Sequence, residues 1–355
     1  MKNSKIPYFF SDKPIFGLDI GPSSLKVMQI EQTESAKKII GYGFTSFDRS
    51  VISDGVVVDT EKIAEAAYKL FKSELIGDIT TRRVAIAIPA YRTFTRAITL
   101  PNLKSREISE AVRLEAEQYV SVPLEQLYLD YEITKQTADE IEVFIVAVPK
   151  DIVDSYLQLT EILGLETVLI EPTLSSSGRL FSIDPQSDIA TVIIDFGSRS
   201  ADISIFDKHV LVTGTVQAGG EIFTNAIRDK LKVSFAEAGL IKTKYGMQRS
   251  KKQTEINAAL EPILAEVIKE IGRMDRYYED RYGNSRPISQ IVTLGGGANM
   301  PGLSDYLTNS IRLPVRHTDP WHFISFKGLQ PPSDADKPMY ATVAGLALAN
   351  PKEVF

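Results

Sequence analysis

The sequence predicts an α/β protein in which one folding unit occurs twice. Residues 16–30 (FGLDIGPSSLKVMQI) align without a gap with residues 192–206 (VIIDFGSRSADISIF). Each stretch contains an apolar strand, an Asp-x-Gly turn and a second apolar strand, and the two aspartates, Asp19 and Asp195, are 176 residues apart. This offset is about half of the 355 residues, and a chain of that length usually forms more than one hydrophobic core. We therefore expect two related lobes.

The composition is that of an ordinary globular protein, with 43 % hydrophobic and 24 % charged residues. A formal net charge of -6 provides no overall attraction for nucleic acid, so we expect no nucleic-acid partner. The chain has no cysteine, which excludes disulfides, thiolate metal sites and cysteine nucleophiles and fits a reducing compartment. The N-terminal residues lack the apolar region of a signal peptide, and no stretch of about 20 residues is apolar enough to span a bilayer. We expect a cytoplasmic protein without direct membrane insertion.

The paired turns are candidates for binding phosphate and a metal ion. Glycines such as Gly21 and Gly197 let backbone N–H groups approach an anion closely, and the neighbouring serine hydroxyls add donors. Asp19 and Asp195 would repel phosphate unless a cation lay between, and together they could hold a hydrated Mg²⁺. Lys26 could reach a terminal phosphate as a point charge. The alternatives are two ordinary hairpin turns and a solvated strand lysine.

Three further stations have the composition of a ligand site. Gly219 and Gly220 precede an amphipathic helix, and a glycine pair at a helix start is an anion-binding arrangement. Gly295–Gly297 follow a buried strand and would let the backbone lie flat against a purine, with Pro301 opening the next helix. Glu171 ends another predicted strand and would align a water for phosphoryl transfer; the alternative is an exposed turn acid. Neither a Walker A loop nor the Rossmann fingerprint occurs.

In this order the stations resemble the actin–Hsp70–sugar kinase superfamily of nucleotide-binding proteins. The five parts of its signature correspond to residues 19–26, 171–178, 195–200, 295–300 and 341–345. The resemblance implies a duplicated actin-like (ribonuclease H-like) ATPase fold, with two lobes and a nucleotide cleft.

The segment that follows the first predicted lobe strands resembles the 1C subdomain of the FtsA and PilM families. The phrases EAEQYVSVPLEQLYLDYEI and FIVAVPKDIVDSYLQLTEILGLE are especially similar to PilM, a family of cytoplasmic actin-like proteins of type IV pilus assembly. The resemblance implies a first lobe (1A) at 1–185 with a 1C-like insert at about 95–166, a second lobe (2A) at 186–336 with a 2B insert at about 220–285, and a C-terminal helix at 337–355 that returns to the first lobe.

The same resemblance implies ATP or ADP as the ligand, with Mg²⁺ near Asp19 and Asp195 and with Glu171 as the catalytic candidate. The phosphates would be surrounded by the turn residues Asp19, Gly21, Ser23, Ser24, Lys26, Asp195, Gly197, Ser198 and Ser200. Ribose and purine would be faced by Gly219, Gly220, Lys242, Gly295, Gly296, Gly297, Asn299 and Met300.

The resemblance also implies partners. PilM-like proteins accept the short cytoplasmic N-terminal tail of a PilN-like inner-membrane protein in a groove between subdomains 1A and 1C. We therefore expect a scaffold that is peripheral to the inner membrane through this partner, with contacts to other pilus platform or motor components and with self-association as a further possibility.

Three departures from the family pattern qualify the expected activity. Pro22 removes one backbone N–H donor from the first turn. Gly239 stands three residues before Lys242, where related proteins have an acid for a ribose hydroxyl. The chain ends in ATVAGLALANPKEVF, without the basic amphipathic helix that tethers FtsA to membranes. We expect at most a weak ATPase; the alternatives are an FtsA-like cell-division filament protein and a small-molecule kinase of the same superfamily.

Overall fold

The structure is a computed structural model that describes residues 13–33, 36–184, 188–283, 285–317, 320–326, 328–334 and 336–350. The described residues form two compact units. The first contains the chain up to Leu180 with Trp321–Pro331 and the residues from Thr342 onwards, and the second contains Phe181–Pro320 with Pro332–Ala341. The expectations about a leader and about the end of the chain concern residues 1–12 and 351–355, which lie outside the described residues.

The first unit is built on a six-stranded mixed sheet. Its strand order is β11 (Glu166–Pro172), β7 (Arg83–Ile88), β1 (Phe16–Ile20), β2 (Ser24–Gln32), β3 (Lys37–Ser46) and β6 (Leu75–Gly77). Strand β1 is antiparallel to β2 and parallel to β7, so the predicted strand–turn–strand stretch is a hairpin in the middle of the sheet. A small β4 (Ile52–Ser53) and β5 (Val56–Val57) pair beside it.

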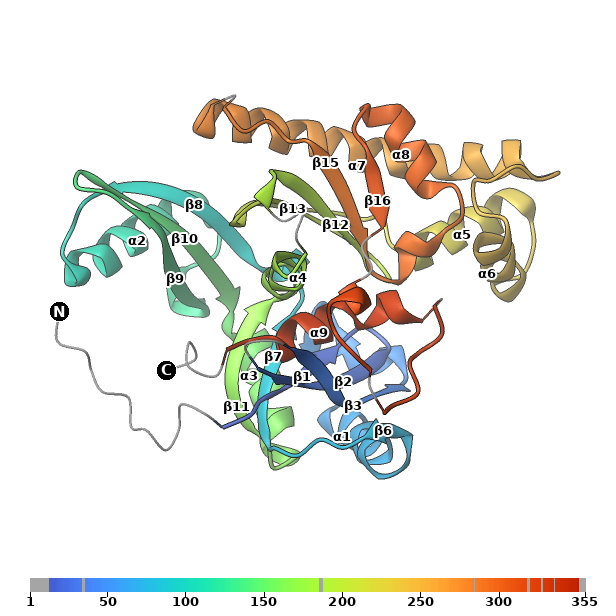
Figure 1. Cartoon of the computed structure of the whole chain (residues 1–355), viewed down its shortest axis with the longest axis horizontal. Helices are drawn as coiled ribbons and strands as arrows, with labels where there is room; N and C mark the ends of the chain where they lie inside the picture. The colour runs from blue at the N-terminus through green and yellow to red at the C-terminus, as the bar shows by residue number, and fades with distance from the viewer. Residues whose placement is uncertain are drawn as a thin grey trace. The chain divides into compact units, whose positions relative to one another are not determined.

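Both faces of this sheet are covered by helices (Figure 1). Strand β7 alternates accordingly: Val84, Ile86 and Ile88 pack into a core with α1 (Thr60–Lys69) and α3 (Lys150–Ile162), whereas its alanines pack against α9 (Ala341–Ala347) on the other face. Helix α9 approaches β1 very closely, because a Cβ on Gly17 would lie 2.5 Å from the Val343 carbonyl oxygen. Helix α9 therefore packs against the sheet of the first unit at a glycine.

The insert in the first unit is a three-stranded antiparallel sheet with one helix. Strands β8 (Phe94–Pro101), β10 (Glu140–Pro149) and β9 (Leu127–Gln136) lie in that order, and α2 (Ser105–Tyr119) packs on them through Ile108 and Val112. Helix α3, which the expected range 95–166 includes, instead packs in the core of the larger sheet through Ile152, Tyr156 and Leu159. The part of that range with a core of its own therefore ends at β10.

The second unit repeats the strand pattern of the first. Its sheet has the order β14 (His209–Val216), β13 (Ala201–Asp207), β12 (Thr191–Phe196), β15 (Gln290–Leu294) and β16 (Val315–His317). Strand β12 is antiparallel to β13 and parallel to β15, as β1 is to β2 and β7, which confirms the duplication.

The helices of the second unit share one core with its sheet. They are α5 (Gly220–Leu231), α6 (Phe235–Lys244), α7 (Gln253–Tyr282) and α8 (Leu303–Ile311). Helix α8 begins two residues after Pro301, the expected first residue, because Gly302 (φ +80°) occupies the cap position in the left-handed region. Helix α4 (Thr173–Ser182), which carries the residues after Glu171, crosses from the first unit into the second along the chain.

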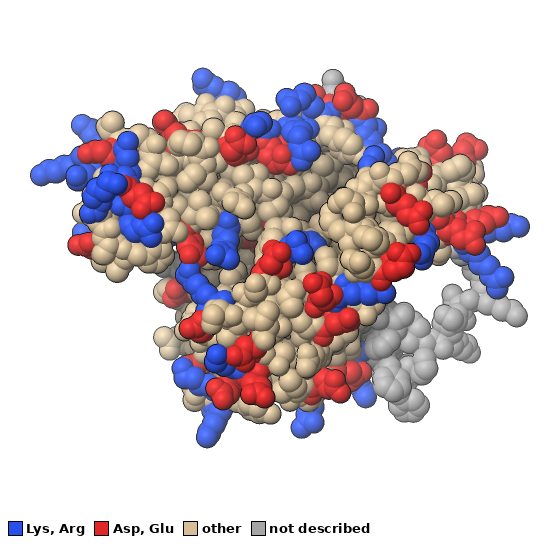
Figure 2. All heavy atoms as spheres, turned by 180° about the vertical axis from the view of Figure 1, so that it is seen from behind, with Lys and Arg blue, Asp and Glu red and all other residues tan. Residues whose placement is uncertain are grey.

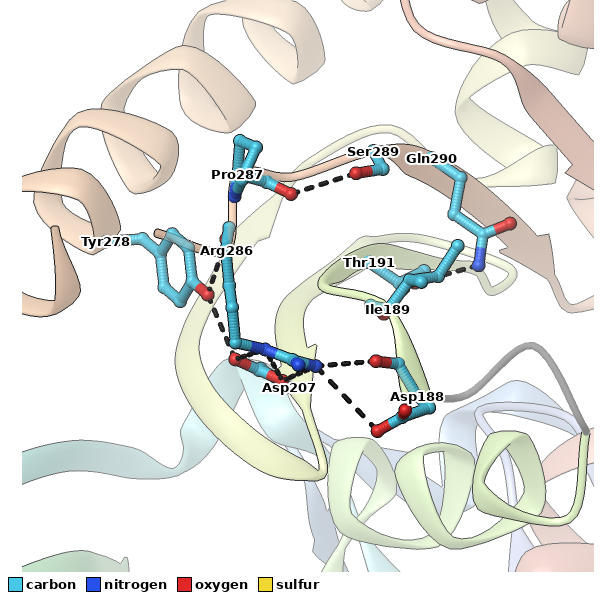
Figure 3. Close-up of polar contacts among 9 residues, drawn as sticks. All are labelled: Asp188, Ile189, Thr191, Asp207, Tyr278, Arg286, Pro287, Ser289 and Gln290. Carbon is cyan, nitrogen blue, oxygen red and sulfur yellow. Dashed lines mark hydrogen bonds and ion pairs between the residues drawn. The ribbon is translucent and has the colours of Figure 1, made fainter. Parts of the chain in front are cut away.

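The end of α7 is tied to the turn between β13 and β14 (Figure 3). The Arg286 guanidinium binds the Asp207 carboxylate, with Nη2 2.7 Å from Oδ1, and also donates to the Asp188 carbonyl oxygen. The hydroxyl of Tyr278 lies 3.1 Å from Oδ2 of Asp207 and 3.0 Å from the Arg286 carbonyl oxygen. This cluster fixes the long helix against the hairpin at one end. Among the described helices, none is both long and apolar enough to cross a membrane.

Candidate functional site

The first turn holds Asp19 and Lys26 opposite each other. The N–H of Gly21 donates to the Ser24 carbonyl oxygen at 2.8 Å, which closes a tight turn, and the hairpin register then pairs Asp19 with Lys26. Nζ of Lys26 lies 2.8 Å from Oδ2 of Asp19, and both residues are only 8 % exposed. The lysine expected at a phosphate therefore neutralises the aspartate expected at the metal.

The second turn has the same backbone geometry with different charges. The N–H of Gly197 donates to the Ser200 carbonyl oxygen at 2.9 Å. Here Asp195 is paired across the hairpin with Asp202, which stands at the position of Lys26 in the repeat, and Thr215 Oγ1 donates to the Asp202 carboxylate at 2.9 Å. Two carboxylates therefore face each other across this hairpin, whereas the first turn pairs a carboxylate with an ammonium group.

The start of α5 packs against the backbone of the second turn. The N–H groups of Gly220 and Glu221 donate to the carbonyl oxygens of Gly197 (2.9 Å) and Ser198 (2.8 Å). A Cβ on Gly219 would clash with the backbone of Ser198, so the first glycine is needed for this close approach. The glycine pair therefore packs the helix onto the second turn, and the N–H groups of Gly220 and Glu221 already have carbonyl partners there. Their proximity to a ribose or purine stays a prediction.

Lys242 lies against the same helix start. Its Nζ donates to the Gly220 carbonyl oxygen at 2.7 Å, and burial lowers the pKa of the ammonium group. The structure thus brings Lys242 beside Gly220, as expected for residues of one site. Gly239 lies one helical turn earlier, and a Cβ there would have no neighbour within 4 Å.

The three glycines after β15 have separate roles. Gly295 has φ +78°, and a Cβ there would clash with the Asp195 carboxylate. A Cβ on Gly297 would lie 2.9 Å from Cβ of Phe196, whereas a Cβ on Gly296 would meet no atom within 4 Å. Gly295 and Gly297 are therefore required by packing, and Gly296 is the glycine of this loop that borders open space.

The remaining residues of this loop differ in exposure. Asn299 is exposed at the end of the short helix Gly296–Asn299, and Met300 is 5 % exposed and packs in the core of the second unit. The side chain of Met300 therefore anchors the loop in the core of the second unit.

Glu171 is not the exposed turn acid of the alternative reading. It is 7 % exposed at the end of β11, and its carboxylate is held by both terminal nitrogens of Arg179, with Nη2 2.6 Å from Oε2. Arg179 also donates to the Gly345 carbonyl oxygen at 3.1 Å. A carboxylate engaged at both oxygens is a poor base for a water molecule until this pair opens.

The structure thus gathers the predicted residues within their own units. In the first unit the turn after β1 carries Asp19, Gly21, Ser23, Ser24 and Lys26. In the second unit the hairpin, the start of α5 and the loop after β15 bring together Asp195, Gly197, Ser198, Gly219, Gly220, Lys242, Gly295 and Gly297. In the described part of the chain, no group of three or more His, Cys, Asp or Glu residues has the geometry to hold a metal ion by itself.

Two polar residues of these arrangements, Asp202 and Arg179, were missed by sequence reasoning. Asp202 could have been found from the repeat, since it aligns with Lys26 and must lie opposite Asp195 once the hairpin forms. The partnership of Arg179 with Glu171 had no comparable signal, because it depends on the angle at which α4 leaves β11.

Comparison with solved structures defines the class of protein. MreB5 of Spiroplasma citri bound to AMPPNP superposes with a TM-score of 0.54 at 13 % identity, covering 94 % of this chain and 95 % of that one. The ethanolamine utilization protein EutJ of Carboxydothermus hydrogenoformans gives 0.52 at 16 % identity, covering 95 % and 91 %. The fold is therefore that of the actin-like proteins, as the resemblance of the five stations implied.

Sequence comparison then gives the family. The family model described as Type IV pilus assembly protein PilM matches residues 17–350, so this chain belongs to the PilM family. A solved PilM–PilN type IV pilus biogenesis complex has a TM-score of 0.80 at 22 % identity, covering 95 % of this chain and 98 % of that one. The cell division protein FtsA of Bacillus subtilis is 27 % identical over 351 residues, covering 83 % of this chain and 77 % of FtsA. The family match supports a pilus assembly scaffold over the FtsA-like alternative.

Proposed function

We propose that this pilus assembly protein binds ATP or ADP through the two turns and the loop after β15. The observation that carries the proposal is that the chain has two Asp-x-Gly hairpins and that Gly296, in the loop next to the second hairpin, borders open space. The actin-like fold supports it, since the solved MreB5 structure of this fold is described as bound to AMPPNP. Ser23, Ser24, Ser198 and Ser200 would supply hydroxyl donors to the phosphates, and Lys242 would lie near the ribose.

Mg²⁺ would fit best beside Asp195. The carboxylates of Asp195 and Asp202 stand on opposite strands of one hairpin, whereas Lys26 already neutralises Asp19. Because Mg²⁺ keeps several waters and shares phosphate oxygens, two carboxylates and a nucleotide suffice to hold it. The ion would neutralise phosphate charge close to these two acids.

Hydrolysis would be slow or absent. We assign Glu171 as the residue that would align the attacking water, but Arg179 holds both of its oxygens. Replacing Arg179 with Gln should free the carboxylate and raise phosphate release over hours, whereas Glu171→Gln should abolish whatever release the wild type has. Equal rates in all three proteins would remove Glu171 from the mechanism.

Thermal unfolding with and without Mg-ATP tests nucleotide binding. A ligand at one hundred times its dissociation constant stabilises a protein by about 2.7 kcal/mol, so millimolar Mg-ATP should raise the melting temperature clearly. EDTA should reduce this gain, because the charges of the phosphates and of the carboxylates would then repel each other. An unchanged melting temperature at millimolar nucleotide would refute this part of the proposal.

We further propose that the first unit binds the cytoplasmic N-terminal tail of a PilN-like inner-membrane protein where the insert meets α3. The solved PilM–PilN complex of this fold supports such a partner. Tyr128, at the start of β9, is 45 % exposed and donates to Asp154 of α3 at 2.8 Å, and Leu157, one turn further along α3, is 37 % exposed. The junction of insert and α3 thus exposes an aromatic side chain, Tyr128, and an aliphatic one, Leu157, which lies three residues after the partner of Tyr128 on the same helix.

Attachment to this partner would hold the protein peripherally at the inner membrane, near other platform or motor components. A peptide with the sequence of the PilN-like tail from the same genome should bind the full-length protein, and Leu157→Asp should weaken it at least about tenfold. Leu114→Asp is the matched control, since Leu114 is also an exposed helical leucine of the first unit but lies on α2. Equal affinity of both variants would exclude this docking surface. Deletion of residues 98–165 cannot test this docking surface, because the deletion would also remove α3 from the core of the first unit.

A further inference from the structure

A groove of about 640 Å³ lies between β14 and α7 in the second unit. Residues Thr215–Gln217 at the end of the strand form one wall, and α7 from Pro262 to Arg276 forms the other. None of these residues belongs to the two turns or to the loop after β15. Thr215, whose hydroxyl donates to Asp202, adjoins the proposed metal site, whereas the other residues of the groove lie outside the proposed nucleotide site and outside the junction of insert and α3.

Strand β14 is the edge of its sheet. It pairs with β13 on one side, and among the described residues no strand pairs with its other side. Every second residue of an edge strand directs its N–H and C=O away from the sheet, which makes such a strand a template for an extended segment. This type of recognition gains affinity from the main chain and selectivity from side-chain contacts.

The groove is preformed because α7 is held along β14. A Cβ on Gly214 would clash with the Glu270 carboxylate, so this glycine lets the helix side chain lie directly over the strand. The Arg286–Asp207 ion pair and the Tyr278 hydroxyl fix the far end of the helix to the turn before β14 (Figure 3). Helix and strand are thus held together at Gly214, inside the groove, and again at the far end of the helix.

The charged wall of the groove carries three cationic side chains and two carboxylates. Lys269, Arg273 and Arg276 are spaced so that they share one face of α7. Glu266 pairs with Lys269 (3.3 Å), and Glu270 binds Arg273, with Nε 2.9 Å from Oε2. Arg276 is exposed and forms no ion pair with any described residue, so the side chains that line the groove have an excess of one positive charge; the Asp275 carboxylate, which does not line the groove, also interacts electrostatically with Arg276.

Figure 2 shows that acidic and basic side chains are interspersed over the face in view, and the formal net charge of the chain is -6, so the protein as a whole does not attract an anionic partner. We propose that the groove binds an extended acidic segment of a partner protein. The segment would add a strand to the free edge of β14 and place a carboxylate against Arg276.

The test uses a fluorescently labelled seven-residue peptide that alternates Glu with Val, and an otherwise identical peptide with Gln in place of Glu. The Glu peptide should bind the full-length protein and slow hydrogen exchange in residues 209–217, and the Gln peptide should bind at least about tenfold more weakly. Arg276→Gln should weaken the Glu peptide about five- to tenfold, and Arg276→Lys should restore most of this loss.

Arg249→Gln is the matched control, because Arg249 is an exposed arginine of the second unit outside the groove. Melting temperatures of all variants should equal that of the wild type, since both arginines are exposed. No binding of the Glu peptide at millimolar concentration, equal affinity of the Arg276→Gln and Arg249→Gln proteins, or exchange protection outside β14 would each overturn the proposal.

Discussion

Lys26 and Asp19 form an ion pair across the first hairpin, with 2.8 Å between Nζ and Oδ2 and with side chains that are only 10 % and 11 % exposed. Each charge is stabilised chiefly by the other, because little water reaches either. The proposed phosphate ligand and the proposed metal ligand of the first unit therefore share one contact. A magnesium nucleotide bound as proposed would have to compete with this ion pair for both residues.

The ion pair predicts a strong energetic coupling. Lys26→Met should lower the free energy of unfolding by about 3 kcal/mol, because it leaves a buried carboxylate without its counter-charge. The double variant Asp19→Asn/Lys26→Met should lose less stability than the sum of the two single variants, since neither charge remains. Urea denaturation of the four proteins measures this cycle. Additive losses would show that the pair is not coupled in solution.

Two helical glycines should respond in opposite ways to substitution by alanine, because Gly345 lies where α9 crosses α4 and Gly239 borders open space in α6. A Cβ on Gly345 would clash with the backbone of Ser176, so Gly345→Ala should destabilise the protein by about 1–3 kcal/mol. Gly239 is a helical glycine with no atom within 4 Å of a Cβ, so Gly239→Ala should stabilise α6 by about 0.5–1 kcal/mol. Thermal unfolding compares the two variants. A stabilised Gly345→Ala protein would contradict the close helix crossing.

Two buried tyrosines predict opposite responses to removal of the hydroxyl. Burial raises the pKa of Tyr156, and its hydroxyl has no hydrogen-bond partner among the described residues. Tyr156→Phe should therefore leave stability unchanged or increase it, because a buried unpaired hydroxyl costs about 1–3 kcal/mol. Tyr278→Phe should destabilise the protein by about 1 kcal/mol, because its hydroxyl has two partners. The same sign for both substitutions would contradict this account.

Tyr278 also predicts a loss of stability in alkali. Burial and the nearby Asp207 carboxylate raise the pKa of the phenol from 10.0 to about 12. Between these two values the unfolded chain releases a proton that the folded protein keeps, so the contribution is complete below pH 10 and falls as pH rises. The free energy of unfolding of the wild type should fall more steeply than that of Tyr278→Phe, by up to about 1.4 kcal/mol per pH unit. Parallel curves between pH 10 and 11 would contradict the raised pKa.

Much of the fold could be predicted because its signals are local. The two hairpins follow from apolar runs on either side of an Asp-x-Gly turn, and α2 and α5 follow from helical periodicity. The assignment of α3 to the main sheet could not be predicted, because its apolar face fits either neighbouring sheet and the choice depends on the complete core.

The sequence predicted which residues belong to the candidate site better than it predicted the contacts that these residues make. The positions of the turns and of Gly296 follow from residue type and spacing. The partner of each side chain depends on strand register and on the angles between helices and strands. Lys26 forms an ion pair with Asp19, and Arg179 binds the carboxylate of Glu171. The N–H groups at the start of α5 donate to carbonyl oxygens of the second turn. These contacts are tertiary, so a pattern of residue types indicates a site without fixing which donor is available to a ligand.

Equilibrium binding of Mg-ATP to the wild type and to Gly296→Val tests the central claim most directly. Gly296 has open space beside its Cα and an ordinary φ, so the variant should fold with an unchanged melting temperature while its side chain fills the space proposed for the adenosine. Titration calorimetry should show saturable binding at one site per wild-type chain and a loss of at least about tenfold in affinity for Gly296→Val. Undetectable binding to the wild type, or equal affinity of the two proteins, would contradict the proposed nucleotide site.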